Sequence, residues 1–129
     1  MNQSIFKAYD VRGRYPGEIN EGIVRSIARS VSKNLGSGKI VIARDARLSS
    51  LKLYRAAINA VHRIRGSRVV GIGLSTTPMF YFLVNHLRAA GGIMITASHN
   101  PKKFNGLKVV GPNAIAIGGR EIYKLATND

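Results

Sequence analysis

Short apolar runs alternate along this chain with longer amphipathic segments, and this alternation constrains the fold more than any other feature. The runs at 39–43, 68–73 and 92–96 are rich in Val, Ile and small residues, as buried strands are. Between them, apolar residues recur every three or four positions over about ten to fifteen residues, a pattern typical of helices in βαβ units. We therefore predict a single α/β domain of three layers, in which a mixed, mainly parallel sheet lies between helices on both of its faces.

Residues that cap helices indicate where the predicted helices begin. Asn20 is a predicted N-cap, because apolar residues at helical spacing follow it up to position 35. Ser49 or Ser50 is predicted to begin a second helix, and a glycine follows each of these two helices. A third helix is expected to open at Thr77-Pro78, since proline is tolerated in the first turn.

The segments near the two ends of the chain have weaker patterns. Ile5–Val11 alternates imperfectly and is predicted to be an edge strand, followed by a turn over 12–17. Asn105-Gly106 is predicted to form a tight turn that leads into a strand over 107–110. A further strand at 114–117 and a short terminal helix at 121–126 complete the expected elements.

The composition excludes several classes of protein and site. The chain has 129 residues, of which 45% are hydrophobic, so it is long enough for one core. It has no cysteine, which excludes disulfides, thiolate metal sites and cysteine nucleophiles. No apolar run reaches the roughly 18 residues of a membrane span, and no apolar signal core follows Met1. We expect a cytoplasmic protein without membrane contact.

The charge of the chain is strongly positive, with 20 Lys and Arg against six Asp and Glu. A net charge of +14 favours anionic partners, which include nucleic acid, anionic membranes and phosphorylated metabolites. The cations are scattered, and the sequence has no zinc-finger spacing or RNA-recognition motif, so most are expected on solvated helix faces. Two alternatives stay open at this point: a basic module that binds a polyanion such as nucleic acid, and a purely structural domain.

A single hydroxyl, that of Ser98, stands where the apolar run 92–96 ends in Asn100-Pro101. Open α/β sheets place their chemistry at the carboxyl ends of strands, so this serine is a candidate for function. A serine hydrolase is disfavoured, because His99 is adjacent in sequence and the Gly-x-Ser-x-Gly pattern is missing. Phosphate chemistry fits better, since cations follow neighbouring strand ends: Arg12, Arg44, Arg47, Lys102, Lys103 and Lys108.

Carboxylates, in contrast, are scarce at this edge of the predicted sheet. Only Asp10 and Asp45 are expected there, and Asp45 has arginines as sequence neighbours that would pair with it. A divalent metal usually needs several oxygen ligands, so the chain does not supply a complete metal site. The Walker pattern and the Gly-x-Gly-x-x-Gly fingerprint are also missing, which disfavours nucleotide binding in those modes.

Four motifs in order along the chain resemble the α-D-phosphohexomutases, the phosphomannomutase/phosphoglucomutase family. The strongest is Thr96-Ala97-Ser98-His99-Asn100-Pro101 with Asn105-Gly106-Leu107-Lys108, which is similar to the family's phosphoserine loop. The others are Phe6-Lys7-Ala8-Tyr9-Asp10-Val11-Arg12-Gly13, Arg44-Asp45-Ala46-Arg47-Leu48-Ser49 and Thr77-Pro78. The resemblance extends from about residue 5 to about residue 119.

The resemblance implies a role for each matching residue. Ser98 would be the phosphocarrier that exchanges phosphoryl groups with a hexose 1- or 6-phosphate, and its phosphate would be one ligand of Mg²⁺. His99 and Lys108 would be candidates for proton transfer, and Arg12 would hold phosphate oxygens. The remaining residues are expected to border the sugar or support the loop: Tyr9, Arg44, Arg47 and Asn100.

Family members have four domains, and the resemblance implies that residues 1–129 correspond to the first. The Asp-Gly-Asp-x-Asp metal loop of the second domain is not found in this sequence. Mg²⁺ would therefore need carboxylates from outside this chain, and we expect the chain by itself to be a poor or inactive mutase. A first domain without its neighbours would also expose an interface, which predicts self-association.

Overall fold

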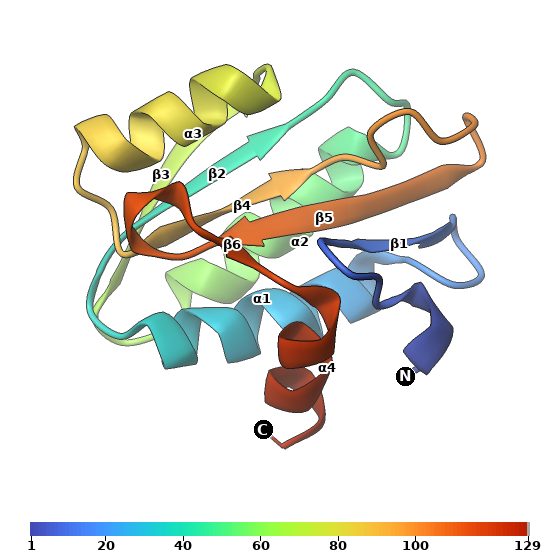
Figure 1. Ribbon diagram of the computed structural model, residues 1–129, viewed down its shortest axis with the longest axis horizontal. Helices are drawn as coiled ribbons and strands as arrows, with labels where there is room; N and C mark the ends of the chain where they lie inside the picture. Colours follow the sequence, from blue (N-terminus) through green and yellow to red (C-terminus); the bar gives the residue numbers. More distant parts are fainter. Residues whose placement is uncertain (129) are drawn as a thin grey trace.

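The computed structural model describes residues 1–128, which form a six-stranded sheet with helices packed on both faces (Figure 1). The elements in chain order are η1 (Gln3–Ile5), β1 (Val11–Arg14), α1 (Glu21–Leu35), β2 (Gly38–Arg44), α2 (Ser50–His62), β3 (Ser67–Leu74), α3 (Thr77–His86), β4 (Gly91–Ile95), β5 (Phe104–Val110), η2 (Pro112–Ala114), β6 (Ala116–Ile117) and α4 (Gly119–Thr127). The predicted three-layer α/β architecture is confirmed.

The sheet is mixed, with strand order β1-β5-β4-β2-β3 and β6 paired to β5. β2 runs parallel to both β3 and β4, and these three strands form the predicted βαβ units. β5 runs antiparallel to β4, β1 and β6. Because β2 and β4 are parallel neighbours, their carboxyl ends lie side by side, at the right of Figure 1.

Two hydrophobic clusters hold the layers together. On one face, α1, α2 and α4 bury Ile27, Leu53 and Ile122 against the sheet. On the other face, α3 packs Phe80 and Val84 against Val41 and Met94. All five residues of β4 are buried, since helices cover both sides of it. Burial on both faces explains why this strand is a continuous apolar run.

One predicted strand is in the wrong place. Ile5–Val11 is not a strand: Gln3–Ile5 form a single 3-10 turn, capped by the Asn2 side chain, and the backbone N–H of Lys7 donates to the Asp10 carbonyl. The strand begins only at Val11 and occupies the first part of the expected 12–17 turn. Ile5 and Val11 are buried at the two ends of a tight bend, which alternation in the sequence cannot distinguish from a strand.

The predicted Asn105-Gly106 turn is also wrong, because both residues lie inside β5. Gly106 pairs with Arg12 of β1, and a Cβ on it would collide with the Val11 carbonyl oxygen. Glycine is therefore required here for close approach of two strands and not for a turn. The strand predicted at 114–117 is reduced to β6, and the terminal helix is confirmed as α4.

The helix starts follow the sequence closely. The Asn20 side chain accepts a hydrogen bond from the Ile23 N–H at 3.0 Å, so the predicted N-cap of α1 is confirmed. α3 begins at Thr77 with Pro78 in its first turn, as predicted. Ser49 occupies the N-cap position of α2, but its hydroxyl makes no capping bond. That hydroxyl has a different partner at the site.

Candidate active site

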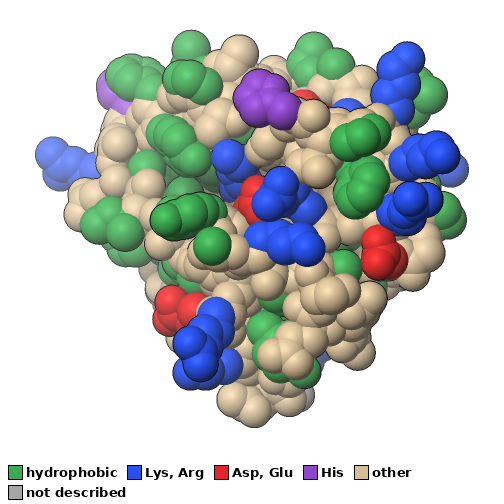
Figure 2. Space-filling model, turned by 45° about the vertical axis from the view of Figure 1, so that its right-hand side comes forward, with side chains coloured by type: hydrophobic (Ala, Val, Ile, Leu, Met, Phe, Trp, Pro, Cys, Tyr) green, Lys and Arg blue, Asp and Glu red, His purple; other side chains and the backbone are tan. Residues whose placement is uncertain are grey.

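The candidate site lies at the edge of the sheet where β2 and β4 end and β1 and β5 pass beside them. Residues 96–103 connect β4 to β5 and carry Ser98. The segment that connects β2 to α2 carries Asp45 and Arg47, and its Asp45 N–H donates to the Ile95 carbonyl at 2.9 Å. Lys and Arg side chains gather on the face of the molecule shown in Figure 2, in which this side comes forward.

Ser98 adopts a left-handed backbone conformation, with φ of 57°. Such a value is uncommon outside glycine and needs support from its surroundings. The Ser98 N–H donates to Thr96 Oγ1 at 3.0 Å, and the Asn100 side chain donates to the Ala97 carbonyl at 2.8 Å. These bonds fold 96–100 into a tight turn. Among residues 1–128, no hydrogen bond involves the Ser98 hydroxyl.

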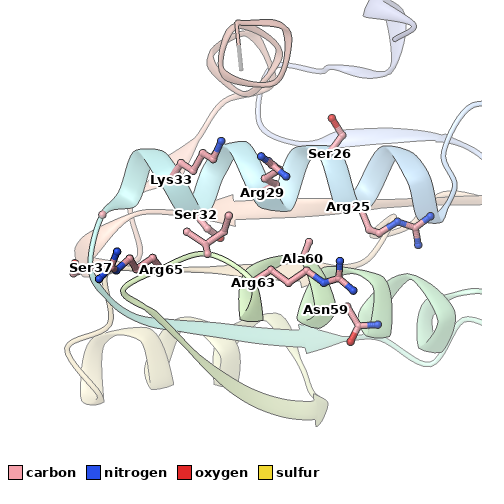
Figure 3. Close-up of a pocket in the computed structure, with 12 residues that line it drawn as sticks. Arg25, Ser26, Arg29, Ser32, Lys33, Ser37, Asn59, Ala60, Arg63 and Arg65 are labelled. Atoms are coloured by element: carbon pink, nitrogen blue, oxygen red, sulfur yellow. The ribbon is translucent and has the colours of Figure 1, made fainter.

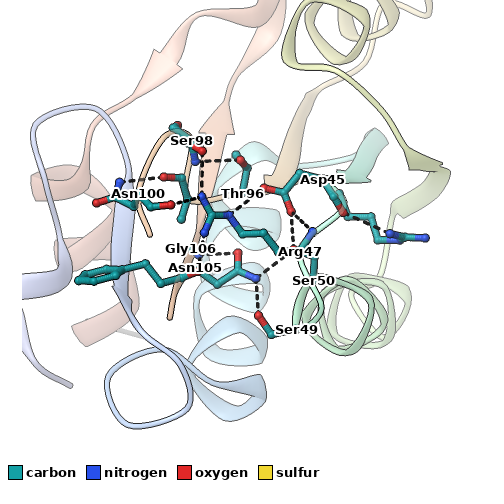
Figure 4. A network of polar contacts seen from close by, with 12 residues as sticks. Asp45, Arg47, Ser49, Ser50, Thr96, Ser98, Asn100, Asn105 and Gly106 are labelled. Carbon is teal, nitrogen blue, oxygen red and sulfur yellow. Dashed lines mark hydrogen bonds and ion pairs between the residues drawn. The ribbon is translucent and has the colours of Figure 1, made fainter. Parts of the chain in front are cut away.

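Arg47 holds this turn from below through the carbonyl oxygens of the loop (Figure 4). Its guanidinium donates to four of them: Nη2 to Ser98 at 2.9 Å and to Asn100 at 2.6 Å, and Nη1 to Pro101 at 2.7 Å and to Phe104 at 3.1 Å. Nε lies 3.3 Å from Asp45 Oδ2. A guanidinium has five N–H groups, and all five are used. Arg47 therefore orders the loop and has no donor left for a ligand.

A buried polar chain extends from Arg47 to the middle of the sheet. Asp45 Oδ1 accepts from the Arg47 N–H and from the Ser50 hydroxyl. The amide nitrogen of Asn105 donates to Ser50 Oγ at 2.9 Å and to Ser49 Oγ at 2.7 Å. Asn105 is fully buried, so these partners satisfy a group that would otherwise be costly to desolvate. The sequence did not indicate this role, although Asn105 belongs to one of the matching motifs.

Arg12 and Lys108 lie on β1 and β5, beside the loop. Arg12 pairs in register with Gly106, whose carbonyl accepts from the Thr96 N–H. Its Nε donates to Asp10 Oδ1 at 2.8 Å, and this ion pair fixes the side chain. Lys108 is half-buried and pairs in register with Met94 of β4.

The other predicted residues vary in how close they come to the loop. Asn100 and Arg47 contact it directly, whereas Arg44 Nη1 donates to the Asp45 carbonyl instead. His99 is exposed next to Ser98, and the Tyr9 side chain is 79% exposed on the approach to β1. The structure thus joins Ser98, Asn100 and Arg47 in one network, with Arg12 on the neighbouring strand.

Tyr15 anchors the far end of the loop. Its backbone N–H donates to the Lys103 carbonyl at 2.8 Å, and its hydroxyl donates to Glu21 Oε1 at 2.9 Å. The hydrogen bond to Glu21 raises the pKa of Tyr15 above its ordinary value of 10.0, and desolvation and the Glu21 charge act in the same direction. The turn before α1 is thereby fastened both to the loop and to the helix.

Comparison with known proteins assigns this arrangement to a family. The family model described as "Phosphoglucomutase/phosphomannomutase, alpha/beta/alpha domain I" matches residues 3–128. The chain belongs to this family. The resemblance drawn from the four sequence motifs is confirmed, and the family model favours a mutase domain over the nucleic-acid-binding alternative.

Individual relatives agree with this assignment. The chain is 46% identical over 110 residues to a Xanthomonas campestris protein named "Phosphohexose mutases", covering 85% of this chain and 24% of that protein. It is 45% identical over 125 residues to a Klebsiella pneumoniae phosphomannomutase, covering 94% of this chain and 79% of the relative. A crystal structure of a phosphoglucomutase/phosphomannomutase family protein from Burkholderia thailandensis superimposes with a TM-score of 0.88 at 33% identity, over 99% of this chain and 31% of that one. The chain thus spans about a quarter of the Xanthomonas relative.

The residues of this phosphohexomutase domain do not fit a Mg²⁺ site without further ligands. Within 1–128, no group of three or more His, Asp or Glu side chains is placed to hold a metal. Asp10 is paired with Arg12, and Asp45 is paired with Arg47 and bonded to Ser50. Both carboxylates are thus already paired with an arginine. No helix in this part of the chain is long and apolar enough to cross a membrane.

Proposed function

We propose that this phosphohexomutase domain carries Ser98 as a phosphocarrier in the interconversion of a hexose 1-phosphate and a hexose 6-phosphate. The observation that supports the proposal best is the geometry of the Arg47 contacts. By taking up four carbonyl oxygens, Arg47 turns the negative ends of these peptide groups away from the outer side of the loop. A phosphate dianion on Ser98 would otherwise be repelled by such oxygens.

The cations near the loop support the same role. Lys102 is exposed on the loop, and Lys108 and Arg12 lie on the strands beside it. Within residues 1–128, Arg12 keeps its terminal nitrogens for a ligand, since its ion pair with Asp10 uses Nε. Positive groups fixed in place stabilise the charge that spreads over the oxygens of a phosphoryl group during transfer. We assign Arg12 to phosphate oxygens.

The proposed transfer exchanges one phosphorus–oxygen bond for another. The bond between Ser98 Oγ and phosphorus breaks while a bond forms from phosphorus to a hydroxyl oxygen of the hexose phosphate. The hydroxyl proton passes to a base and a proton returns to Ser98 Oγ, with His99 and Lys108 as the candidate carriers. The bisphosphorylated sugar then reorients in the site and returns its other phosphoryl group to Ser98. Tyr9 and Asn100 would border the sugar and support the loop.

Several parts of the proposal lie outside this chain. We propose that residues 1–129 correspond to the first of the family's four domains, and that carboxylates from outside the chain hold Mg²⁺ together with the Ser98 phosphate. A cytoplasmic location, where sugar phosphates are found, belongs to the same proposal. We also expect pairing of two copies through the exposed apolar side chains of Leu74, Met79 and Phe82. Light scattering that shows a monomer at high concentration would contradict that pairing.

Intact mass spectrometry tests the carrier role. The purified chain is incubated with glucose 1,6-bisphosphate and Mg²⁺, and we expect the mass of one added phosphate. Ser98→Ala should lose this addition completely, whereas the control Ser75→Ala, just after β3 and two strands away from β4, should keep it. Equal phosphorylation in Ser98→Ala and wild type would contradict the proposal.

A further inference from the structure

A second basic surface lies away from the Ser98 loop, between α1 and α2. These helices pack side by side on one face of the sheet, and a hollow of about 1010 Å³ opens between them (Figure 3). Twelve residues line it: Arg25, Ser26, Arg29, Ser32, Lys33, Gly36, Ser37, Asn59, Ala60, Arg63, Ile64 and Arg65. We call this surface the α1–α2 groove. None of its residues belongs to the candidate active site.

The groove and the Ser98 loop lie at opposite ends of β2. The groove includes Ser37, just before β2 begins, while Arg44 ends the strand at the active-site edge. Seven residues of strand span roughly 20 Å at about 3.3 Å per residue. A ligand in the groove therefore would not touch Ser98 or its neighbours, and the groove needs an explanation of its own.

The charge of the groove is of one sign. Five of its lining residues are Arg or Lys, all of them exposed, and no Asp or Glu within residues 1–128 lines it. Arg25, Arg29 and Lys33 follow each other at intervals of four along α1, so like charges lie one turn apart. Arg25 and Arg63 extend from opposite helices toward the space between them in Figure 3. An anion between the two helices would be attracted by Arg25 and Arg63 from both sides.

A buried hydroxyl adds an independent observation. Ser32 is fully buried, lines the groove, and its Oγ has no hydrogen-bond partner among the described residues. A buried hydroxyl without a partner costs stability, and native proteins keep few of them. Ser26, Ser37 and Asn59 supply further polar groups around the same hollow. The groove thus combines positive charge with hydrogen-bond donors, which is what phosphate oxygens require.

From this juxtaposition we propose that the α1–α2 groove binds a small anion with two or more phosphate groups. The volume suits a ligand of that size better than a flat protein surface. Among the twelve described residues that line the groove none is aromatic, so it offers nothing for the bases of single-stranded nucleic acid to stack on. Of the described lining residues, Ala60 and Ile64 alone have apolar side chains, which gives an acidic protein no large anchor.

The test uses inorganic tripolyphosphate as the probe, with pyrophosphate and phosphate for comparison, at constant ionic strength. Calorimetric titration of the full chain should show saturable binding that weakens in that order. The double variant Arg25→Gln with Arg63→Gln should weaken tripolyphosphate binding by about tenfold or more, because each substitution removes one guanidinium group that can donate two hydrogen bonds to a phosphate. The matched control, Arg68→Gln with Arg120→Gln, removes the same charge from exposed positions outside the groove and should bind like wild type.

Amide NMR spectra locate the bound probe, and Ser32→Ala tests the hydroxyl. We expect shifts at Ser32, Ser37 and Asn59, and severalfold weaker binding in Ser32→Ala without a loss of thermal stability. Equal loss of affinity in both double variants, or shifts confined to 98–103, would overturn the proposal. So would an oligonucleotide or a polyglutamate chain that displaces tripolyphosphate at lower concentration, since the ligand would then be a macromolecule. Undiminished affinity in Ser32→Ala would overturn the assignment of the Ser32 hydroxyl to the bound anion.

Discussion

Arg47 Nη2 lies 2.9 Å from the carbonyl oxygen of Ser98, across 51 residues of sequence. This contact joins the segment after β2 to the left-handed turn after β4, and three further carbonyls of the loop share the same guanidinium. The conformation of Ser98 therefore depends on a side chain from the segment that connects β2 to α2.

The first prediction is that Arg47→Lys loosens the Ser98 loop. Lysine has three donors and no planar fork, so at least two of the five contacts are lost and the carbonyls lose their partners. We expect a loss of roughly 1–3 kcal/mol in the free energy of unfolding, measured in urea. Phosphorylation of Ser98 by glucose 1,6-bisphosphate should also slow. Arg55→Lys, at an exposed position of α2, is the matched control.

Asn105→Ala should destabilise the domain through the buried polar chain. The substitution removes the donor to Ser49 and Ser50 and leaves Asp45 with a less restrained partner. A loss of about 1–3 kcal/mol is expected. Urea denaturation checks this against Asn85→Ala, where the side chain is exposed on α3. Equal stability of the two variants would show that the buried polar chain from Arg47 to Asn105 contributes little to the free energy of unfolding.

The sequence predicted the parts of this fold that depend on local pattern, and missed the parts that depend on distant partners. Alternating apolar runs and capping residues placed the strands, helices and Ser98 at the edge of the sheet. Arg47 was expected to support the loop, but its acceptors are backbone carbonyls, which no residue type reveals. Asn105-Gly106 signals a turn locally, yet Ser49, Ser50 and the Val11 carbonyl decide its conformation. Those partners come from other segments of the chain.

Gly92→Ala should destabilise the centre of the sheet. A Cβ at this position would lie 2.7 Å from the Phe80 ring and 2.9 Å from the Val41 carbonyl oxygen. Overpacking of this kind typically costs about 1–3 kcal/mol, because ring and strand must both shift. The control is Gly17→Ala, where nothing lies within 4 Å of the added carbon. Thermal melts should separate the two variants, and matching midpoints would contradict the prediction.

The raised pKa of Tyr15 predicts a loss of stability in alkali. Because the folded state favours the neutral phenol, the hydrogen bond to Glu21 stabilises the fold fully below the ordinary pKa of 10.0. This contribution is lost as the pH rises through the higher pKa of the folded state. The free energy of unfolding of wild type should therefore fall more steeply above about pH 10 than that of Tyr15→Phe. Parallel pH profiles of the two proteins would contradict the assignment.

The last prediction is that the purified chain does not act as a mutase at an ordinary rate. Asp10 and Asp45 are both held in ion pairs, so the chain offers no cluster of free carboxylates within residues 1–128 to hold Mg²⁺ beside Ser98. A metal ion held beside the reacting phosphate stabilises the transition state of phosphoryl transfer by several kcal/mol. Turnover should therefore be lower by about a thousandfold or more than in an enzyme that has these ligands. Conversion of glucose 1-phosphate, coupled to glucose 6-phosphate dehydrogenase with glucose 1,6-bisphosphate and Mg²⁺ present, measures it. Ser98→Ala sets the background, and Ser98-dependent turnover above about 1 s⁻¹ would show that the ligands missing here are not needed. Because phosphate on Ser98 is read separately by mass, slow phosphorylation of Ser98 without ordinary turnover would show that the missing ligands limit the rate of phosphoryl transfer between Ser98 and the sugar in both directions.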